Sequence, residues 1–280
     1  MKKITRRSFL AAAGLSVAAL ALTACGGSSS SVASSVASSA AASSEAASTS
    51  AAAGELTTVE AGKLTMATNA AFPPYEMTTD AGEFEGIDVE TAQAIADKLG
   101  LELQIDDMDF DAALLSVQQG KADIVMAGVT VTDERKAVMD FSDSYATGIQ
   151  SIIVPEGSDI ASPDDLAGKK IGTQRGTTGY IYCSDDFGDE NVVAYDNGLT
   201  AVQALNNGQV DAVVIDNAPA KEFVAANPGL VILDTSYAEE DYAIGMAKGS
   251  SLEAAINSDL EELKADGTLQ SIVDKYITAE

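Results

Sequence analysis

The sequence predicts an α/β protein of two similarly built lobes, each with a mostly parallel sheet flanked by helices. Short β-type runs alternate with helical patterns along the body of the chain, and the alternation starts again in its second half. Strands that alternate with helices are typical of parallel sheets covered on both faces. Residues 55–280 also provide enough chain for one large domain or two small ones.

The first half of this body alternates strands with helices. Apolar residues at helical spacing predict a helix over Val89–Leu99, and Gly100 ends it. Patterns of the same kind predict strands at Lys63–Thr68, Leu101–Ile105 and Ile124–Ala127, and a helix at Phe110–Gln119.

The second half repeats the alternation. The predicted strands are Lys170–Thr173, Val192–Tyr195 and Ala212–Ile215. The predicted helices are Thr177–Ser184, Leu199–Asn206 and Ala218–Ala226.

One segment in each half shares a pattern. Residues 114–126 and 202–214 both contain a helical stretch, a glycine stop, an aspartate and a buried strand. Two unrelated helix–strand units can match this far by chance, but one copy in each half suggests two lobes built alike. Ligands of open α/β sheets sit beyond the carboxyl ends of the strands. We therefore expect residues 127–130 and 215–217 to face a shared cleft.

The N-terminus predicts export and lipid anchoring. Residues 1–24 have a basic start and an apolar stretch from Phe9 to Leu22 that is short for a membrane span, as in a signal peptide. Small residues before Cys25 suit cleavage ahead of a lipid-modified (palmitate-bearing) thiol, although an ordinary cleavage site with a chance cysteine is the alternative. Residues 5–10 resemble a twin-arginine export signal, and two ordinary basic-region arginines explain them equally well.

Residues 25–54 are predicted to form a disordered tether that starts at the lipidated cysteine. After two glycines, this segment consists almost entirely of Ser, Ala and Val and has no aromatic residue. An alanine-rich helix is the competing interpretation, which the serines weaken. The mature protein is thus expected outside the cytoplasm, with its membrane contact made only through the lipid.

Composition excludes several classes of function. The formal net charge of −27 argues against binding of nucleic acid or of an anionic membrane through the general field. The chain has no histidine, which excludes Ser–His and Cys–His nucleophilic sites and histidine-ligated metals. With Cys25 lipidated, Cys183 is left alone and is expected to be a packed free thiol. We expect no metal, no cofactor and a monomer.

Arg135 is the first candidate ligand-binding residue. Its planar guanidinium matches a carboxylate with two parallel bonds, and the hydroxyl of Thr130 can add a third. Thr132 and Asp133 can cap the short helix that carries it. The alternative is a surface arginine that pairs with Asp133 or Glu134.

Three further features complete a candidate site. The turn at residues 176–179 precedes a predicted helix, whose first N–H groups can bind an anion, although an ordinary strand–helix turn is the alternative. Asp216 ends a buried strand and can accept bonds from an ammonium group, or it can cap the next helix. Phe72 and Phe110 can be core residues or can enclose a ligand. A carboxylate clamp, an anion site and an ammonium acceptor are what a zwitterionic α-amino acid needs.

The motifs resemble those of the polar amino-acid-binding proteins of ABC importers, which include glutamine-, histidine- and lysine/arginine/ornithine-binding proteins. The resemblance runs from about Lys63 to Ile277, and its marks, in order, are residues 68–76, 86–90, 108–110, 127–135, 141–142, 168–172 and 176–178. It implies a type II periplasmic-binding-protein fold, with lobe I at residues 55–146 and 242–280, lobe II at 147–241, and a two-strand hinge. It also implies capture of an amino acid, polar or cationic, for the permease subunits of an importer.

The resemblance also implies roles for individual residues. Arg135 corresponds to the clamp for the α-carboxylate, and Asp216, with the Gly128 carbonyl, to the acceptor for the α-ammonium. Asn69 stands where several members carry an aspartate, which weakens a preference for lysine or arginine. Arg175, near the side-chain end of the pocket, can favour an acidic or polar ligand or point into solvent. The full set of expected ligand-binding residues is Asn69, Phe72, Phe110, Ala127, Gly128, Thr130, Arg135, Gln174, Thr177, Thr178 and Asp216.

Two other classes of function share this fold. Cyclohexadienyl dehydratase-like enzymes need a placed acid–base carboxylate. Asp216 sits at the amine-binding position, and the sequence offers no second candidate, so we expect no catalytic residue and no enzyme. A ligand-sensing module is the other alternative, and it would need a membrane partner.

Overall fold

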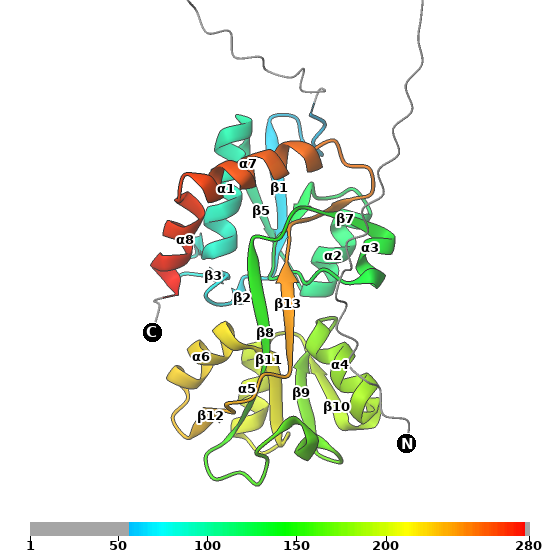
Figure 1. Cartoon of the computed structure of the whole chain (residues 1–280), viewed down its shortest axis with the longest axis vertical. Coiled ribbons are helices and arrows are strands. Elements are labelled where there is room, and N and C mark those ends of the chain that lie inside the picture. The colour runs from blue at the N-terminus through cyan, green and yellow to red at the C-terminus, as the bar shows by residue number, and fades with distance from the viewer. Residues whose placement is uncertain (1–55, 278–280) are drawn as a thin grey trace, which may run out of the picture. The chain divides into compact units, whose positions relative to one another are not determined.

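The computed structural model describes residues 56–277, which fold into two large sheets with flanking helices and one small sheet (Figure 1). The predicted signal peptide, the lipidation of Cys25 and the tether lie outside the described residues. No helix in residues 56–277 is long and apolar enough to cross a membrane.

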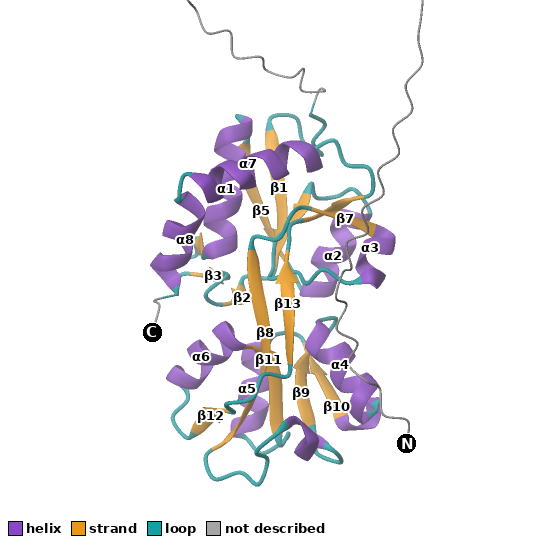
Figure 2. Cartoon of the chain, viewed as in Figure 1, coloured by secondary structure: helices purple, strands orange, loops and turns teal. Residues whose placement is uncertain are grey.

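The first sheet combines strands from both ends of the described chain. Helices α1 (Ile87–Leu99), α2 (Phe110–Gln118), α3 (Asp133–Val138), α7 (Glu253–Ala265) and α8 (Thr268–Tyr276) belong to this half of the molecule (Figure 2). Its strand order is β5 (Glu102–Asp107), β1 (Lys63–Thr68), β6 (Ile124–Val125), β14 (Gly245–Ala247) and β7 (Met139–Phe141).

The second sheet is built from the middle of the chain. Helices α4 (Thr178–Phe187), α5 (Gly198–Asn206) and α6 (Asn217–Ala226) flank it, and short 3₁₀ turns cover Pro163–Leu166 and Asp189–Asn191. Its strand order is β10 (Val192–Tyr195), β9 (Ile171–Gln174), β11 (Ala212–Asp216), β8 (Ala146–Pro155) and β12 (Leu230–Ile232), with β13 (Ala238–Tyr242) also paired to β8.

The predicted α/β class and the mostly parallel strand direction are confirmed. In the first sheet only β14 runs against the other described strands, and in the second only β8 does. Every predicted strand and helix is present, with ends shifted by at most three residues. The sequence patterns missed the small sheet of β2 (Ala71–Phe72), β3 (Glu76–Thr78) and β4 (Phe84–Glu85). They also missed β7, β8 and the strands and helices after residue 226.

Strands β8 and β13 link the two sheets. They pair antiparallel from Ala146↔Tyr242 to Gln150↔Ala238, and they run side by side between the halves of the molecule (Figure 1). This pair matches the predicted two-strand connection. The predicted lobe boundaries, at 146/147 and 241/242, fall at the first rung of this ladder and stay a prediction of where the lobes divide.

The helix α1 shows how the sequence sets the packing. Val89, Ala92, Ile95 and Ala96 recur at helical spacing, and all four are buried against the core. Gly100 then ends the helix in the left-handed conformation, with φ of 69°, which a residue without Cβ adopts at little cost.

The predicted packed thiol is confirmed. Cys183 is a buried free cysteine on α4, in a hydrophobic cluster with the strands of the second sheet. Burial raises the pKa of its thiol to about 12, so the thiolate is disfavoured and the group is unreactive at neutral pH.

Candidate functional site

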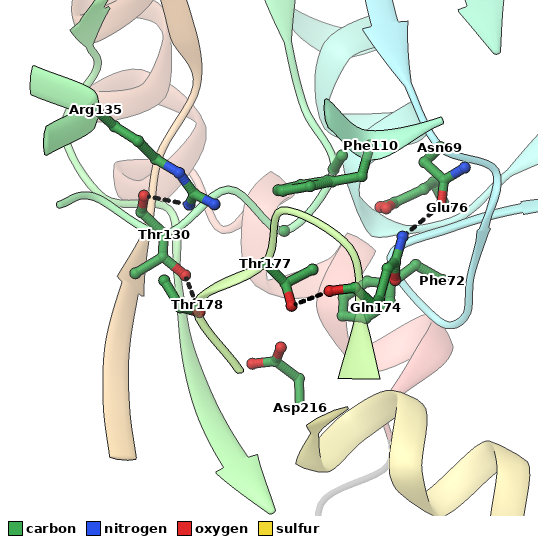
Figure 3. A pocket seen from close by; sticks show the side chains of 12 residues that line it. Asn69, Phe72, Glu76, Phe110, Thr130, Arg135, Gln174, Thr177, Thr178 and Asp216 are labelled. Atoms are coloured by element: carbon green, nitrogen blue, oxygen red, sulfur yellow. Dashed lines mark hydrogen bonds between the residues drawn. The ribbon is translucent and has the colours of Figure 1, made fainter. Parts of the chain in front are cut away.

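The ends of the strands meet at one enclosed cavity. The empty space between its walls, including the part open to solvent, is about 310 Å³. All eleven predicted site residues line it, together with Glu76, which the sequence did not assign (Figure 3). The lining comes from both sheets, and its members are Asn69, Phe72, Glu76, Phe110, Ala127, Gly128, Thr130, Arg135, Gln174, Thr177, Thr178 and Asp216.

Arg135 is held rigidly at the cavity wall. Helix α3 carries it, and the Thr132 hydroxyl caps this helix by accepting a 3.2 Å bond from the Arg135 backbone N–H. Its Nη1 donates to the Thr130 carbonyl at 2.8 Å and its Nη2 to the Gly176 carbonyl at 3.1 Å. The guanidinium carbon also lies 5.3 Å from the centre of the Phe110 ring.

The side chain of Arg135 makes no ion pair within residues 56–277, and it is only 8% exposed. The alternative of a surface arginine paired with Asp133 or Glu134 is therefore wrong. Burial lowers the pKa of the guanidinium, which stays charged because the group does not deprotonate in proteins. A buried positive charge without a carboxylate partner favours an anionic group of a ligand.

Asp216 supplies an opposite charge to the same cavity. It stands at the N-cap position of α6, but its side chain makes no capping bond, so the alternative of a helix cap is wrong. Its Oδ2 accepts a 2.8 Å bond from Gln150 Nε2, while its buried Oδ1 has no hydrogen-bond partner among the described residues. The pKa of this carboxyl is raised to about 7, mainly because burial disfavours the charged form and also through repulsion by Glu240.

Hydrogen bonds join the two sides of the cavity. Gln174, at the end of β9, donates from Nε2 to Asn69 Oδ1, just after β1, at 2.9 Å. The Arg135 bond to Gly176 also joins the two sides. These bonds place residues that are far apart in the sequence around one enclosed space.

The start of α4 faces the cavity. Thr177 is its N-cap, accepting a bond from the Tyr180 backbone N–H and donating to the Gln174 carbonyl at 2.8 Å. This is the predicted anion-binding turn. Arg175, beside it, lies outside the cavity lining with about half of its side chain exposed, and its Nη2 donates to the Ala194 carbonyl.

Two aromatic rings form apolar walls. Phe72 and Phe110 belong to hydrophobic clusters, which confirms the core interpretation, and they also line the cavity, so a role in enclosing a ligand stays a prediction. Gly128 has φ of 55°, and a Cβ at this position would lie 2.9 Å from the Phe72 ring. Only glycine therefore fits there without strain or a shift of the wall.

Glu76 is the lining residue that the sequence analysis missed. It is fully buried at the start of β3, and neither carboxylate oxygen has a hydrogen-bond partner among the described residues. Burial raises its pKa well above the usual value, and Asp88 adds to the shift. Its signal in the sequence is weak, because a single carboxylate after Pro-Pro-Tyr resembles any turn residue.

Asp88 lies behind Glu76 and is also fully buried. Its Oδ2 accepts a 3.0 Å bond from the Gly128 backbone N–H. Burial raises the pKa of Asp88 to about 6. No group of described residues has the arrangement of His, Cys, Asp and Glu that a metal ion needs.

The comparisons with known proteins show the family of this chain. Residues 64–279 match the model of the bacterial extracellular solute-binding proteins, family 3. A probable histidine-binding protein of Neisseria gonorrhoeae is 33% identical over 277 residues, which cover 96% of this chain and 95% of that protein. The L-cystine-binding protein TcyJ of Escherichia coli K12 is 32% identical over 226 residues, 79% of this chain and 85% of that protein.

A solved structure gives the same fold. The arginine-, lysine-, histidine-binding protein ArtJ of Geobacillus stearothermophilus has a TM-score of 0.75 and 34% identity, and the match covers 78% of this chain and 96% of that one. The resemblance noted in the motifs is thereby confirmed across both sheets. This chain belongs to family 3 of the bacterial extracellular solute-binding proteins.

Proposed function

We propose that this protein captures an α-amino acid with a cationic side chain outside the cytoplasm and delivers it to an ABC importer. The observation that carries the proposal is the pairing of Arg135 and Asp216 in one enclosed cavity. Both side chains are buried, and they make no ion pair with each other among the described residues. An α-carboxylate at Arg135 and an α-ammonium at Asp216 would compensate both groups.

Glu76 supports a cationic side chain. Glu76 is fully buried, and burial is the main reason why the pKa of its carboxyl is raised, so the ionised form needs a donor or a cation beside it. A guanidinium, ammonium or imidazolium group at this wall would provide donors and would favour the ionised carboxylate. Relatives named for histidine or for arginine, lysine and histidine are consistent with this choice. Asn69 in place of an aspartate argues the other way, and we give Glu76 more weight because its carboxyl group can ionise beside a cation.

The N-terminal part of the proposal concerns location. We infer that residues 1–24 direct export and that Cys25 is lipidated after cleavage, so that a Ser- and Ala-rich tether connects the binding domain to the membrane. A Cys25→Ser variant should be released from the membrane fraction while it keeps its affinity for ligand. Retention of this variant in the membrane fraction would contradict the anchor.

Calorimetry and thermal shift of the full-length protein test the ligand class. L-Arginine, L-lysine and L-histidine should raise the unfolding temperature more than L-glutamine or L-cystine, because a ligand of the native state stabilises it by mass action. L-Aspartate serves as the control with the wrong side-chain charge. A shift with glutamine or cystine alone would overturn the assignment of a cationic side chain. The proposal that the ligand is an α-amino acid would still stand. No shift with any amino acid, in protein shown to be folded and free of carried-over ligand, would overturn the proposal.

The cavity contains a second carboxyl group, which bears on the enzyme alternative. The sequence offered no carboxylate besides Asp216, but the structure places Glu76 in the same cavity. The case for binding therefore rests on the relatives, which are named as binding proteins. A turnover assay with prephenate and arogenate is the direct control, and product formation would favour the dehydratase alternative.

A further inference from the structure

Two threonine hydroxyls at the cavity point their protons away from it. Thr130 Oγ1 donates to Glu240 Oε2 at 3.0 Å, and Thr178 Oγ1 donates to the same oxygen at 2.9 Å. The hydroxyls also lie 3.5 Å from each other, but a carboxylate at 2.9–3.0 Å is the stronger acceptor. Each hydroxyl has one proton, so both present only lone pairs to the cavity.

A buried amide completes this network. Gln150 Nε2 donates to Glu240 Oε2 at 3.0 Å and to Asp216 Oδ2 at 2.8 Å, which uses both of its protons. Asp216 keeps only Oδ1 without a partner among the described residues. Glu240 and Gln150 are both buried and do not line the cavity, so they contact the lining residues from the side away from the cavity.

The placement of Glu240 is specific to the strand pair that links the two sheets. It lies on β13 opposite Gly148 of β8, with its side chain buried, while its neighbour Glu239 is exposed. Thr130 follows β6 of the first sheet, and Thr178 begins α4 beside the second. One carboxylate therefore orients a hydroxyl from each side of the cavity.

We propose that Glu240 is a positioning residue for the ligand's α-ammonium group, because it fixes Thr130 and Thr178 as hydrogen-bond acceptors beside Asp216. The inference rests on the proposed function, which supplies an amino acid with this group. In this assignment the Thr130 hydroxyl binds the ammonium end of the ligand, and not the carboxylate that the sequence had predicted. The carboxylate is then left to Arg135 and the start of α4.

Paired probes isolate this role. L-Arginine and its analogue without the α-ammonium, 5-guanidinopentanoate, are titrated into full-length wild type, Glu240→Gln and the exposed-neighbour control Glu239→Gln. Glu240→Gln should weaken L-arginine about tenfold or more, the loss expected for a charged hydrogen-bond network. It should change the analogue less than about threefold, and Glu239→Gln should change neither probe. Equal losses for both probes would show that Glu240 has only a structural role. Unchanged affinities would show that Glu240 takes no part in ligand recognition.

A double variant tests whether Glu240 acts through the hydroxyl of Thr130. If Glu240 acts through the hydroxyl of Thr130, then Glu240→Gln should cost less L-arginine affinity in a Thr130→Val background than in wild type. Additive losses would show that Glu240 does not act through Thr130, and would overturn that step.

The directions of the two threonine hydroxyls can also be measured without ligand, in case L-arginine fails to bind. That failure would count against the proposed cationic ligand and not against Glu240. Neutron diffraction from deuterated crystals of the full-length protein locates the hydroxyl deuterons. Both deuterons should point to Glu240 Oε2, and a deuteron on Thr130 that points into the cavity would overturn the proposal.

Discussion

The Gln174 side chain donates a 2.9 Å hydrogen bond to Asn69 Oδ1, and so joins the end of β9 to the end of β1 across the cavity. Asn69 in turn donates from Nδ2 to the Met108 carbonyl at 2.9 Å. Both side chains are buried, so the amide pair is a polar bridge away from water. Loss of one partner leaves the other buried polar group without a hydrogen bond, which lowers the free energy of unfolding.

Replacement of Gln174 by leucine should therefore destabilise the protein. The variant leaves Asn69 Oδ1 buried without its donor, which costs about 1–3 kcal/mol of the free energy of unfolding. Gln203→Leu on the exposed face of α5 is the matched control and should stay within about 0.5 kcal/mol of wild type. Urea unfolding measures both, and equal stabilities for the two variants would contradict the bridge.

Arg135 is expected to carry much of the affinity for the α-carboxylate. Arg135→Ala removes the charge from a buried site and should weaken L-arginine binding by about 3–5 kcal/mol, as when one partner of a buried pair is lost. Arg135→Lys keeps the charge but not the planar guanidinium, so its affinity for L-arginine should lie between those of wild type and Arg135→Ala. Titration calorimetry on variants shown to be folded gives these values. Unchanged affinity in Arg135→Ala would make the carboxylate assignment wrong.

Much of this site could be predicted from the sequence because its residues follow strand ends. Arg135, Thr130 and Asp216 stand directly after or close to predicted buried strands, and parallel topology brings such ends together. The chemistry of these residue types then indicated a zwitterion. The same reasoning gave the strand and helix order, since alternating patterns define it before any packing is known.

Other parts of the site were not predictable in this way. Glu76 and Glu240 lie in short or late strands, β3 and β13, that no periodic pattern marked. Whether a Glu is buried depends on which strands pair, and the sequence shows no difference between Glu239 and Glu240. The direction of the Thr130 hydroxyl depends on that burial, so its role followed only from the folded contacts.

Ligand affinity should depend on pH through Asp216. Its pKa is raised to about 7 by burial first and by Glu240 second, so near neutral pH a large share of the carboxyl is protonated. An ammonium group needs the ionised form, and L-arginine affinity should therefore fall as the pH drops from 8 to 6. Asp216→Asn should bind more weakly and depend less steeply on pH, with the remaining dependence coming from Glu76. A wild-type affinity that is flat between pH 8 and 6 would contradict the assignment.

The stability of the ligand-free protein should change with pH in the opposite direction. Glu76, Asp88 and Asp216 have raised pKa values in the folded state, mainly because they are buried. The folded state therefore binds more protons than the unfolded state between about pH 4 and 7, and stability rises as the pH falls through this window. Thermal unfolding at pH 7.5 and 5.5 measures it, and Asp216→Asn should show a smaller difference. Lower stability at pH 5.5 than at 7.5 would contradict this account.

Glu76 should determine the preference among side chains. Glu76→Gln removes the carboxyl group that can ionise beside a cationic side chain but keeps the shape, so L-arginine should bind about tenfold or more weakly while L-glutamine changes little. If Glu76 takes up the ligand's charge, it must release its bound proton when L-arginine binds, because a nearby cation lowers a carboxyl pKa. Calorimetry of wild type in buffers of different ionisation enthalpy counts that proton, and Glu76→Gln should release less. Equal weakening of arginine and glutamine, or the same proton count in both proteins, would place the ligand's side chain away from Glu76.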